Sequence, residues 1–292
     1  MGSQPLTLRA LRQWSLNQLT PIYSEAEAQA IVRRLLRHFM PDWEQQWLLS
    51  QGQAHFPSEH WHSWQQAITR LQQEEPLGYI LGEVAFGELT LKVRPGVFIP
   101  RPETEEWTSW LIQRRQTQPP RSILDIGTGS GAIAIRLAYH FPEAQVYAID
   151  KSPLALATTA ANALLYGIRL TTAQVELGKE RLPVTWPAEW ELIVANPPYI
   201  SWSYWGQTER RVRLYEPPEA LFCRDKELYE VIANFALQSL SPTGECIVEL
   251  FPPTASAVQV LWEGVGFSCE IYCDISGRPR WLRAVRKQRL AV

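Results

Sequence analysis

The chain has 292 residues, 46% of them hydrophobic, which is enough for one large domain or for a large domain with a smaller one. A net charge of −2 and a pI near 6.3 argue against a broad polyanion-binding surface. No apolar run is long enough to span a bilayer, and Met1-Gly-Ser-Gln-Pro5 does not begin a secretory signal, so we expect a cytoplasmic protein that does not bind membranes.

Residues 1–75 are predicted to form a small helical bundle. Ser24 and Glu27 make a capping box, and apolar residues recur behind it at helical spacing until Pro41 ends the helix. Five tryptophans in this region either fill the core of the bundle or form a docking surface for a partner protein, and the core is the commoner place for such residues. They are Trp14, Trp43, Trp47, Trp61 and Trp64.

Residues 76–104 are predicted to join the bundle to the rest of the chain. The stretch Glu75-Pro-Leu-Gly-Tyr-Ile-Leu-Gly82 breaks the helical period, and residues 84–93 then alternate as in a β-hairpin. Three prolines between Pro95 and Thr104 predict a fixed, non-regular path. This proline-rich segment is either a domain linker or one wall of a functional site, and the pattern favours neither.

Residues 105–292 are predicted to form an α/β domain that binds a nucleotide-like cofactor. A buried strand that ends near Asp125 leads into the glycine loop Gly127-Thr128-Gly129-Ser130-Gly131 and then into a helix. Glycines allow close backbone approach, and a helix N-terminus offers free N–H groups. The next strand ends at Asp150, whose carboxylate can accept both hydroxyls of a ribose. Taken alone, this unit fits a nicotinamide dehydrogenase nearly as well as a methyltransferase.

The turn Asn196-Pro197-Pro198-Tyr199 separates these two classes. It follows an apolar strand, and two prolines cannot extend that strand. The turn should therefore leave the sheet at the carboxyl end of the strand, where open α/β folds bind their ligands. The Asn196 side-chain oxygen and the Pro197 carbonyl can accept the two hydrogens of a planar NH2 group, and the Tyr199 ring can cover its face. Transfer of a methyl group to an NH2 nitrogen needs such a turn, whereas hydride transfer does not.

The remaining residues continue the α/β alternation and close with an antiparallel pair of strands, Phe267–Cys273 and Arg280–Arg286. This order predicts a mixed seven-stranded sheet with helices on both faces. The four cysteines complete no tetrahedral ligand pattern, so no metal site is expected. They stand at positions 223, 246, 269 and 273.

The chain resembles the release-factor glutamine methyltransferases over nearly its whole length. Five stretches carry the resemblance: Glu75-Pro-Leu-Gly-Tyr-Ile-Leu-Gly82, Phe98-Ile-Pro-Arg-Pro-Glu-Thr-Glu105, Asp125-Ile-Gly-Thr-Gly-Ser-Gly-Ala-Ile-Ala134, Asn196-Pro-Pro-Tyr-Ile200 and Tyr215-Glu-Pro217. The resemblance implies a Rossmann-like class I methyltransferase fold that acts on class I peptide chain release factors. The N-terminal bundle would dock that protein substrate. We also expect the protein to be a monomer that does not bind nucleic acid directly.

The resemblance also implies roles for individual residues. Gly127 to Gly131 would cradle S-adenosylmethionine, Asp150 would bind its ribose, and Glu176 with Leu177 would stand near its adenine. Asn196, Pro197, Pro198 and Tyr199 would grip the glutamine of the Gly-Gly-Gln motif in the release factor, with Asn196 also beside the cofactor. The sequence departs from the family pattern at Gln174–Gly178, Phe222–Lys226 and Phe251-Pro252.

Two further hypotheses stay open at this point. An adenine-N6 DNA methyltransferase must hold the same kind of NH2 group, on a base flipped out of the duplex. The mild acidity of the chain and the lack of a recognisable target-reading domain argue against that function. A non-catalytic relative that binds protein is the second hypothesis, and the departures from the family pattern are what favour it.

Overall fold

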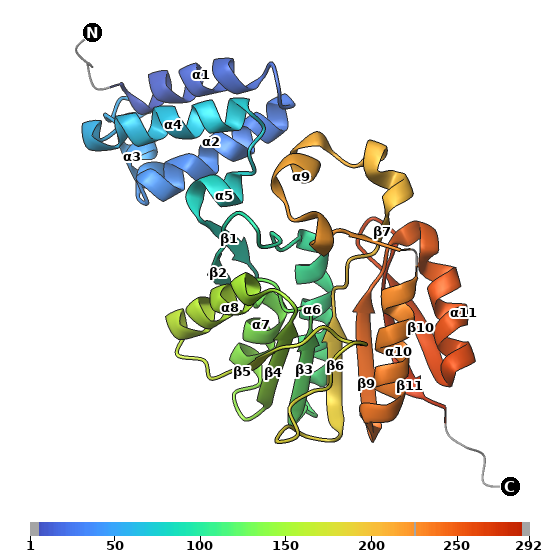
Figure 1. The fold of residues 1–292 in the computed structure, drawn as a ribbon. Helices are drawn as coiled ribbons and strands as arrows, with labels where there is room; N and C mark the ends of the chain where they lie inside the picture. The colour runs from blue at the N-terminus through green and yellow to red at the C-terminus, as the bar shows by residue number, and fades with distance from the viewer. Residues whose placement is uncertain (1–5, 225, 288–292) are drawn as a thin grey trace, which may run out of the picture. The chain divides into compact units, whose positions relative to one another are not determined.

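The computed structural model describes residues 6–224 and 226–287 of the chain (Figure 1). The expected lack of an export signal concerns residues 1–5, which lie outside the described residues. The chain forms two compact units: one extends to Gly82 and includes Arg210–Tyr215, and the other contains Glu83–Glu209 and the chain from Glu216 onward. Among the described residues, no helix combines the length and the apolar character needed to cross a membrane.

The first unit is helical, as predicted. The Thr7 and Ser24 hydroxyls cap the first two helices by accepting N–H bonds from Ala10 and Glu27 at 3.2 and 3.3 Å. Trp64 is fully buried in the core of this unit. The other four tryptophans are partly buried and pack against the same core. The elements are α1 (Leu8–Leu19), α2 (Glu25–Phe39), α3 (Trp43–Ser50), η1 (Ser58–His60), α4 (Trp61–Gln72), α5 (Leu77–Leu81) and α9 (Arg210–Tyr215).

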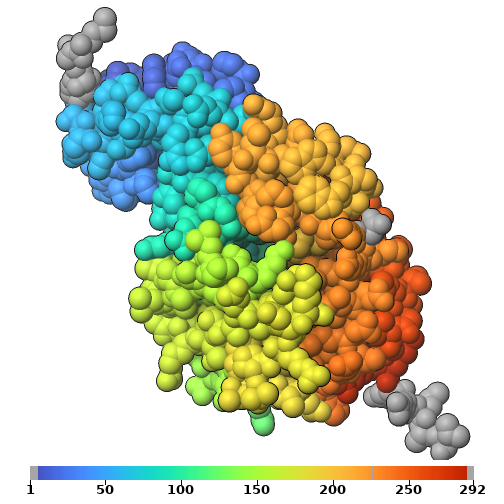
Figure 2. Space-filling view, in the orientation of Figure 1, coloured from blue at the N-terminus to red at the C-terminus, as the bar shows by residue number. Residues whose placement is uncertain are grey.

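Two elements of this unit differ from the sequence-based expectation. The stretch that was expected only to break the helical period contains the short helix α5, and Gly82, with φ +73°, caps its C-terminus. Helix α9 comes from far along the chain, where no helix was predicted. Arg211 of α9 pairs with Glu27, and the Tyr215 hydroxyl donates to the carbonyl of Gln73 at 2.8 Å. In the space-filling view this orange segment lies against the cyan part of the helical unit (Figure 2).

The second unit begins with the predicted hairpin and is built on the predicted mixed seven-stranded sheet. The strand order is β10-β11-β9-β6-β3-β4-β5. The pairs among β9, β6, β3, β4 and β5 are parallel, and β11 is antiparallel to both β9 and β10. The strands are β1 (Glu83–Phe86) and β2 (Leu89–Lys92) of the hairpin, then β3 (Ser122–Ile126), β4 (Gln145–Asp150), β5 (Thr171–Gln174), β6 (Trp190–Ala195), β9 (Leu240–Glu249), β10 (Phe267–Cys273) and β11 (Pro279–Arg286).

Helices cover both faces of this sheet (Figure 1). Successive residues of a strand point to opposite faces, so Ile123 packs against α6 and α7, whereas Leu124 packs in the cluster formed with α10 and α11. The apolar runs on both faces explain why the parallel strands read as continuous hydrophobic segments. The helices are α6 (Pro102–Arg115), α7 (Ala132–His140), α8 (Pro153–Leu165), α10 (Glu227–Ser239) and α11 (Ala255–Val265), with the short turn η4 (Pro252–Thr254).

The segment between β6 and α10 has an irregular structure that the sequence did not predict. Two two-residue strands, β7 (Ile200–Ser201) and β8 (Phe222–Cys223), pair in parallel beside the main sheet. Two 3-10 turns lie between them in the sequence, η2 (Trp202–Gln207) and η3 (Pro218–Ala220). This arrangement brings the chain after Glu216 back to the end of β6, where the candidate site lies.

Candidate functional site

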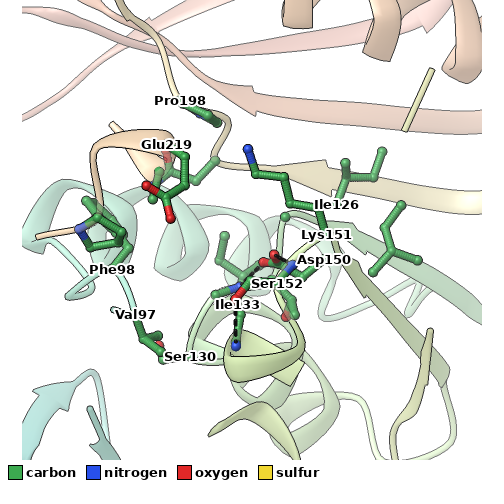
Figure 3. A pocket seen from close by; sticks show the side chains of 18 of the residues that line it. Val97, Phe98, Ile126, Ser130, Ile133, Asp150, Lys151, Ser152, Pro198 and Glu219 are labelled. Carbon is green, nitrogen blue, oxygen red and sulfur yellow. Dashed lines mark hydrogen bonds between the residues drawn. The ribbon is translucent and has the colours of Figure 1, made fainter. Parts of the chain in front are cut away.

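A cavity of about 220 Å³ lies at the carboxyl ends of β3, β4 and β6 in the second unit. Parallel strands end at the same edge of the sheet, and the loops that leave them leave room for a ligand there. Figure 3 shows Ser130, Asp150, Phe98, Pro198 and Glu219 around this space. The loop after β3, the end of β4, the turn after β6 and the proline-rich segment before α6 therefore share one site.

The glycine loop forms an open cradle along the cavity wall. Gly127 and Gly129 have φ angles of +73° and +59°, which side-chain-bearing residues rarely adopt. A Cβ atom at either position would meet no other atom within 4 Å, so the backbone of both faces open space. Thr128 and Ser130 also line the cavity, but Gly131 does not. A Cβ on Gly131 would lie 2.8 Å from Ile135 Cδ1, so this glycine serves close packing of the helix.

Asp150 is held at the end of β4 by two backbone N–H groups. Its Oδ2 accepts from Gly129 at 2.9 Å and its Oδ1 accepts from Ser152 at 2.8 Å. Burial raises the pKa of Asp150, and these two bonds oppose that rise. Each carboxylate oxygen has two acceptor positions, so the carboxylate can still accept from a ligand. Asp150 is therefore a fixed acceptor that can take the paired hydroxyls of a ribose.

Asp125 lies directly behind the glycine loop. It is fully buried, and its Oδ2 accepts the Thr128 hydroxyl at 2.7 Å. Burial raises the pKa of Asp125 to about 7, because removing the carboxylate from water disfavours its charged form. This aspartate supports the loop from within the protein.

The turn after β6 presents two of its four residues to the cavity. Asn196 and Pro198 line it, whereas Pro197 is buried and Tyr199 does not line it. The Asn196 amide donates from Nδ2 to Thr104 Oγ1 at 3.0 Å. The Tyr199 ring stacks on Phe251 with centroids 6.0 Å apart, and its hydroxyl donates to Glu249 Oε1 at 2.9 Å. Contact of the Tyr199 ring with a substrate amide stays a prediction.

The proline-rich segment forms part of the cavity wall, which answers the question that its sequence left open. Val97, Phe98 and Pro100 line the cavity. Arg101 pairs with Glu216, whose side chain is only 1% exposed, and the Arg101 guanidinium lies 4.8 Å from the centre of the Phe98 ring. The ion pair attaches the segment to the chain that follows α9, and the cation–π contact lies within the segment.

Several residues of the site were missed by the sequence analysis. The side chains of Lys151 and Glu219 line the cavity, and Thr104 both lines it and contacts Asn196. Glu249 is fully buried beneath the turn. The one signal for Glu249 was an acidic residue at the end of an otherwise apolar strand, which is uncommon unless the carboxylate has partners.

The residues around the cavity fit S-adenosylmethionine. The open backbone cradle, the fixed carboxylate of Asp150 and the apolar surfaces of Val175, Leu177 and Leu228 lie around one space. Of the predicted cofactor residues, all except Gly131 line this space, including Glu176. A ribose, a charged methionine portion and an adenine ring need this combination of acceptors, donors and apolar wall.

Comparison with known proteins agrees with this geometry. Residues 88–207 match the Methyltransferase small domain family, and residues 10–82 match the PrmC N-terminal domain family. A ribosomal protein L11 methylase from Lactobacillus delbrueckii subsp. bulgaricus shares the fold, with a TM-score of 0.50 and 19% identity over 70% of this chain and 99% of that one.

Curated relatives span most of the chain. The release factor glutamine methyltransferase of Flavobacterium psychrophilum is 36% identical over 75% of this chain and 79% of its own length. The enzymes of that name from Mycolicibacterium smegmatis and Deinococcus radiodurans are 36% and 31% identical, over 72% and 87% of this chain and 75% and 90% of theirs. This chain therefore belongs to the release factor glutamine methyltransferase family.

Proposed function

We propose that this protein methylates the side-chain amide nitrogen of the glutamine in the Gly-Gly-Gln motif of class I peptide chain release factors, with S-adenosylmethionine as methyl donor. One observation carries the proposal. Asn196, an amide able to bind another amide, lies in the wall of the same cavity as the glycine loop and Asp150. Membership of the family supports the choice of substrate.

The cofactor would be held by groups that the fold fixes beforehand. The backbone of Gly127 and Gly129 faces open space, and the Asp150 carboxylate is held in place by the Gly129 and Ser152 N–H groups. Leu177 and Leu228 provide apolar surface in the same cavity. S-adenosylmethionine supplies a methyl group activated by a positively charged sulfur.

The protein's task is to make an amide nitrogen react. An amide nitrogen is a poor nucleophile because its lone pair is delocalised into the carbonyl, so holding it in the attacking orientation contributes much of the rate. Asn196 Oδ1 would accept one N–H hydrogen, and the carbonyl of Pro197, a buried residue that does not itself line the cavity, would accept the other. These acceptors would stabilise the positive charge that develops on nitrogen during attack. No strong base is needed early, because the methylated nitrogen becomes acidic and can then lose its proton.

We further propose that the helical unit docks the release factor, and that the enzyme is a cytoplasmic monomer that does not bind nucleic acid directly. A substrate that takes part in translation supports the location, and the net charge of −2 supports the lack of nucleic-acid binding. The adenine-N6 DNA methyltransferase and the non-catalytic binder are not favoured, because the relatives that span most of this chain are release factor glutamine methyltransferases.

Mass spectrometry tests the proposal. A purified class I release factor is incubated with the protein and S-adenosylmethionine, digested, and examined for one added methyl on the Gly-Gly-Gln glutamine. A release factor with that glutamine changed to alanine is the substrate control, and an adenine-containing DNA duplex is the competing substrate. A methylated duplex with an unmodified release factor would refute the proposal.

A further inference from the structure

We propose that Thr104, Trp107 and Glu249 are positioning residues that fix which atom of the Asn196 amide faces the cavity. The inference rests on the proposed function, since it concerns how Asn196 would receive a substrate NH2 group. An asparagine amide has an oxygen that accepts hydrogen bonds and a nitrogen that donates them. Only the oxygen can accept from a substrate NH2. An amide turned the other way would place its own NH2 against the substrate NH2, and neither group could accept a hydrogen bond.

The three residues form a connected set beneath the turn. Glu249, at the end of β9, is fully buried, and its Oε2 accepts from the Thr104 hydroxyl at 2.6 Å and from Trp107 Nε1 at 2.9 Å. Thr104 Oγ1 in turn accepts from Asn196 Nδ2 at 3.0 Å. Thr104 and Trp107 both belong to α6 and are both buried, so one helix places the two donors on one oxygen.

The chemistry of the donors determines the direction of each bond. The indole N–H of Trp107 can only donate, so Glu249 Oε2 must act as an acceptor. The Thr104 hydroxyl has a single proton, and it is directed to that oxygen. What Thr104 Oγ1 can offer Asn196 is therefore a lone pair, which binds Nδ2 and excludes Oδ1. The Asn196 oxygen is left as the part of the amide available to a ligand.

This direction holds both for the charged Glu249 carboxylate and for a carboxyl protonated on Oε1. Burial raises the pKa of Glu249, while its three side-chain donors lower it. When the carboxyl is protonated on Oε1, Oε2 still accepts from Trp107 and Thr104. Oε1 faces the Tyr199 hydroxyl, which can accept as well as donate. In both states the Asn196 amide donates from Nδ2 to Thr104 Oγ1.

The kinetic test uses substitutions that change hydrogen-bonding capacity with little change in shape. In Thr104→Val the amide loses its partner, and we expect kcat for release factor methylation to fall about tenfold or more, the effect of losing one well-aligned hydrogen bond in the transition state. KM and the calorimetric affinity for S-adenosylmethionine should stay near their wild-type values. Thr104→Ser keeps the hydroxyl and should restore most of kcat.

Glu249→Gln gives a sharper result. The glutamine oxygen must face Trp107 and Thr104, because Trp107 only donates, and its NH2 group then faces the Tyr199 hydroxyl, which can accept. The polarity at Asn196 is unchanged, so this variant should also keep most of kcat. Thr108→Val is the matched control, since it removes another buried hydroxyl of α6 that bonds to the Thr104 carbonyl and to Arg136. It should lower stability without lowering kcat.

A measurement without substrate separates this inference from the proposed function. In 15N-labelled protein the Asn196 side-chain NH2 signals can be assigned by their loss in Asn196→Asp. They should exchange slowly with water in the wild type, Thr104→Ser and Glu249→Gln, and at least about tenfold faster in Thr104→Val, where a hydrogen bond is lost. Unchanged exchange in Thr104→Val, or a loss of kcat in Glu249→Gln as large as in Thr104→Val, would overturn the inference. A wild type that methylates no release factor but shows the expected exchange would refute the proposed function alone.

Discussion

Arg101 and Glu216 pair across 115 positions of the chain, with the Glu216 side chain 1% exposed and that of Arg101 29% exposed. Glu216 also accepts the backbone N–H of Ile99 at 3.4 Å. The pair thereby joins the proline-rich wall of the cavity to the segment after α9. A buried carboxylate needs such a partner, because its desolvation is costly when it is left alone.

Removing one member of this pair should lower the free energy of unfolding more than removing both members does. Arg101→Met leaves Glu216 buried without its cation and should lower the free energy of unfolding by up to about 3 kcal/mol, near the low end for a buried pair because Arg101 is partly exposed. The double variant Arg101→Met with Glu216→Gln should be more stable than Arg101→Met alone. Urea unfolding measures both. A double variant as unstable as the sum of the single changes would show that the two residues are not coupled.

Asn196→Ala should separate binding from turnover. The variant loses the proposed acceptor for the substrate amide but leaves the glycine loop and Asp150 intact. We expect S-adenosylmethionine to bind with nearly wild-type affinity by calorimetry, while turnover of a release factor falls by about a hundredfold, as when one preorganised hydrogen-bonding group is removed. Near-normal methylation by the purified variant would exclude this role for Asn196.

Asp150→Ala should have the opposite effect on the two measurements. It removes the acceptor proposed for the ribose and also the partner of the Gly129 and Ser152 N–H groups. The dissociation constant for S-adenosylmethionine should rise by about tenfold to a hundredfold, the range for hydrogen bonds to a charged group. Turnover at saturating cofactor should change much less. Asn196→Ala is the control, and equal affinities in the two variants would contradict the role given to Asp150.

The parts of the fold that repeat a simple pattern could be predicted from sequence. The strand Gln145–Asp150 is an apolar run that ends in an acid, and the structure gives β4 the same bounds. The prolines of the turn end β6 at Ala195 for the reason predicted, because they cannot continue a strand. The glycine loop comes directly after β3 and Asp150 ends β4, so most of the cofactor side of the cavity was predictable.

The remaining parts depend on contacts between distant positions. Helix α9 has only six residues, too few to show a periodic pattern, and its contacts with Glu27 and Gln73 lie in another part of the sequence. Thr104 and Glu249 are 145 positions apart, and neither residue alone indicates a role in orienting Asn196. Sequence pattern identifies residues that act through the backbone, whereas side-chain networks become visible only when the fold brings their members together.

The buried carboxyl of Asp125 should make stability depend on pH. Its pKa is raised from an ordinary value of 3.8 to about 7 by burial, so the folded protein holds a proton that the unfolded chain releases between those values. The stabilisation is complete below about pH 3.8 and is lost as the pH rises through about 7. Asp125→Asn cannot ionise, and its amide oxygen can still accept the Thr128 hydroxyl.

The free energy of unfolding of the wild type, compared with that of Asp125→Asn, should therefore fall steadily between about pH 4 and pH 7. Above that range the difference between the two proteins should level off. Other titrating groups are common to both proteins and cancel in the comparison. Urea unfolding in matched buffers across this range measures the difference. A constant difference would mean that folding does not raise the pKa of Asp125. A difference that grows in favour of the wild type with rising pH would mean that the charged form is the stabilised one.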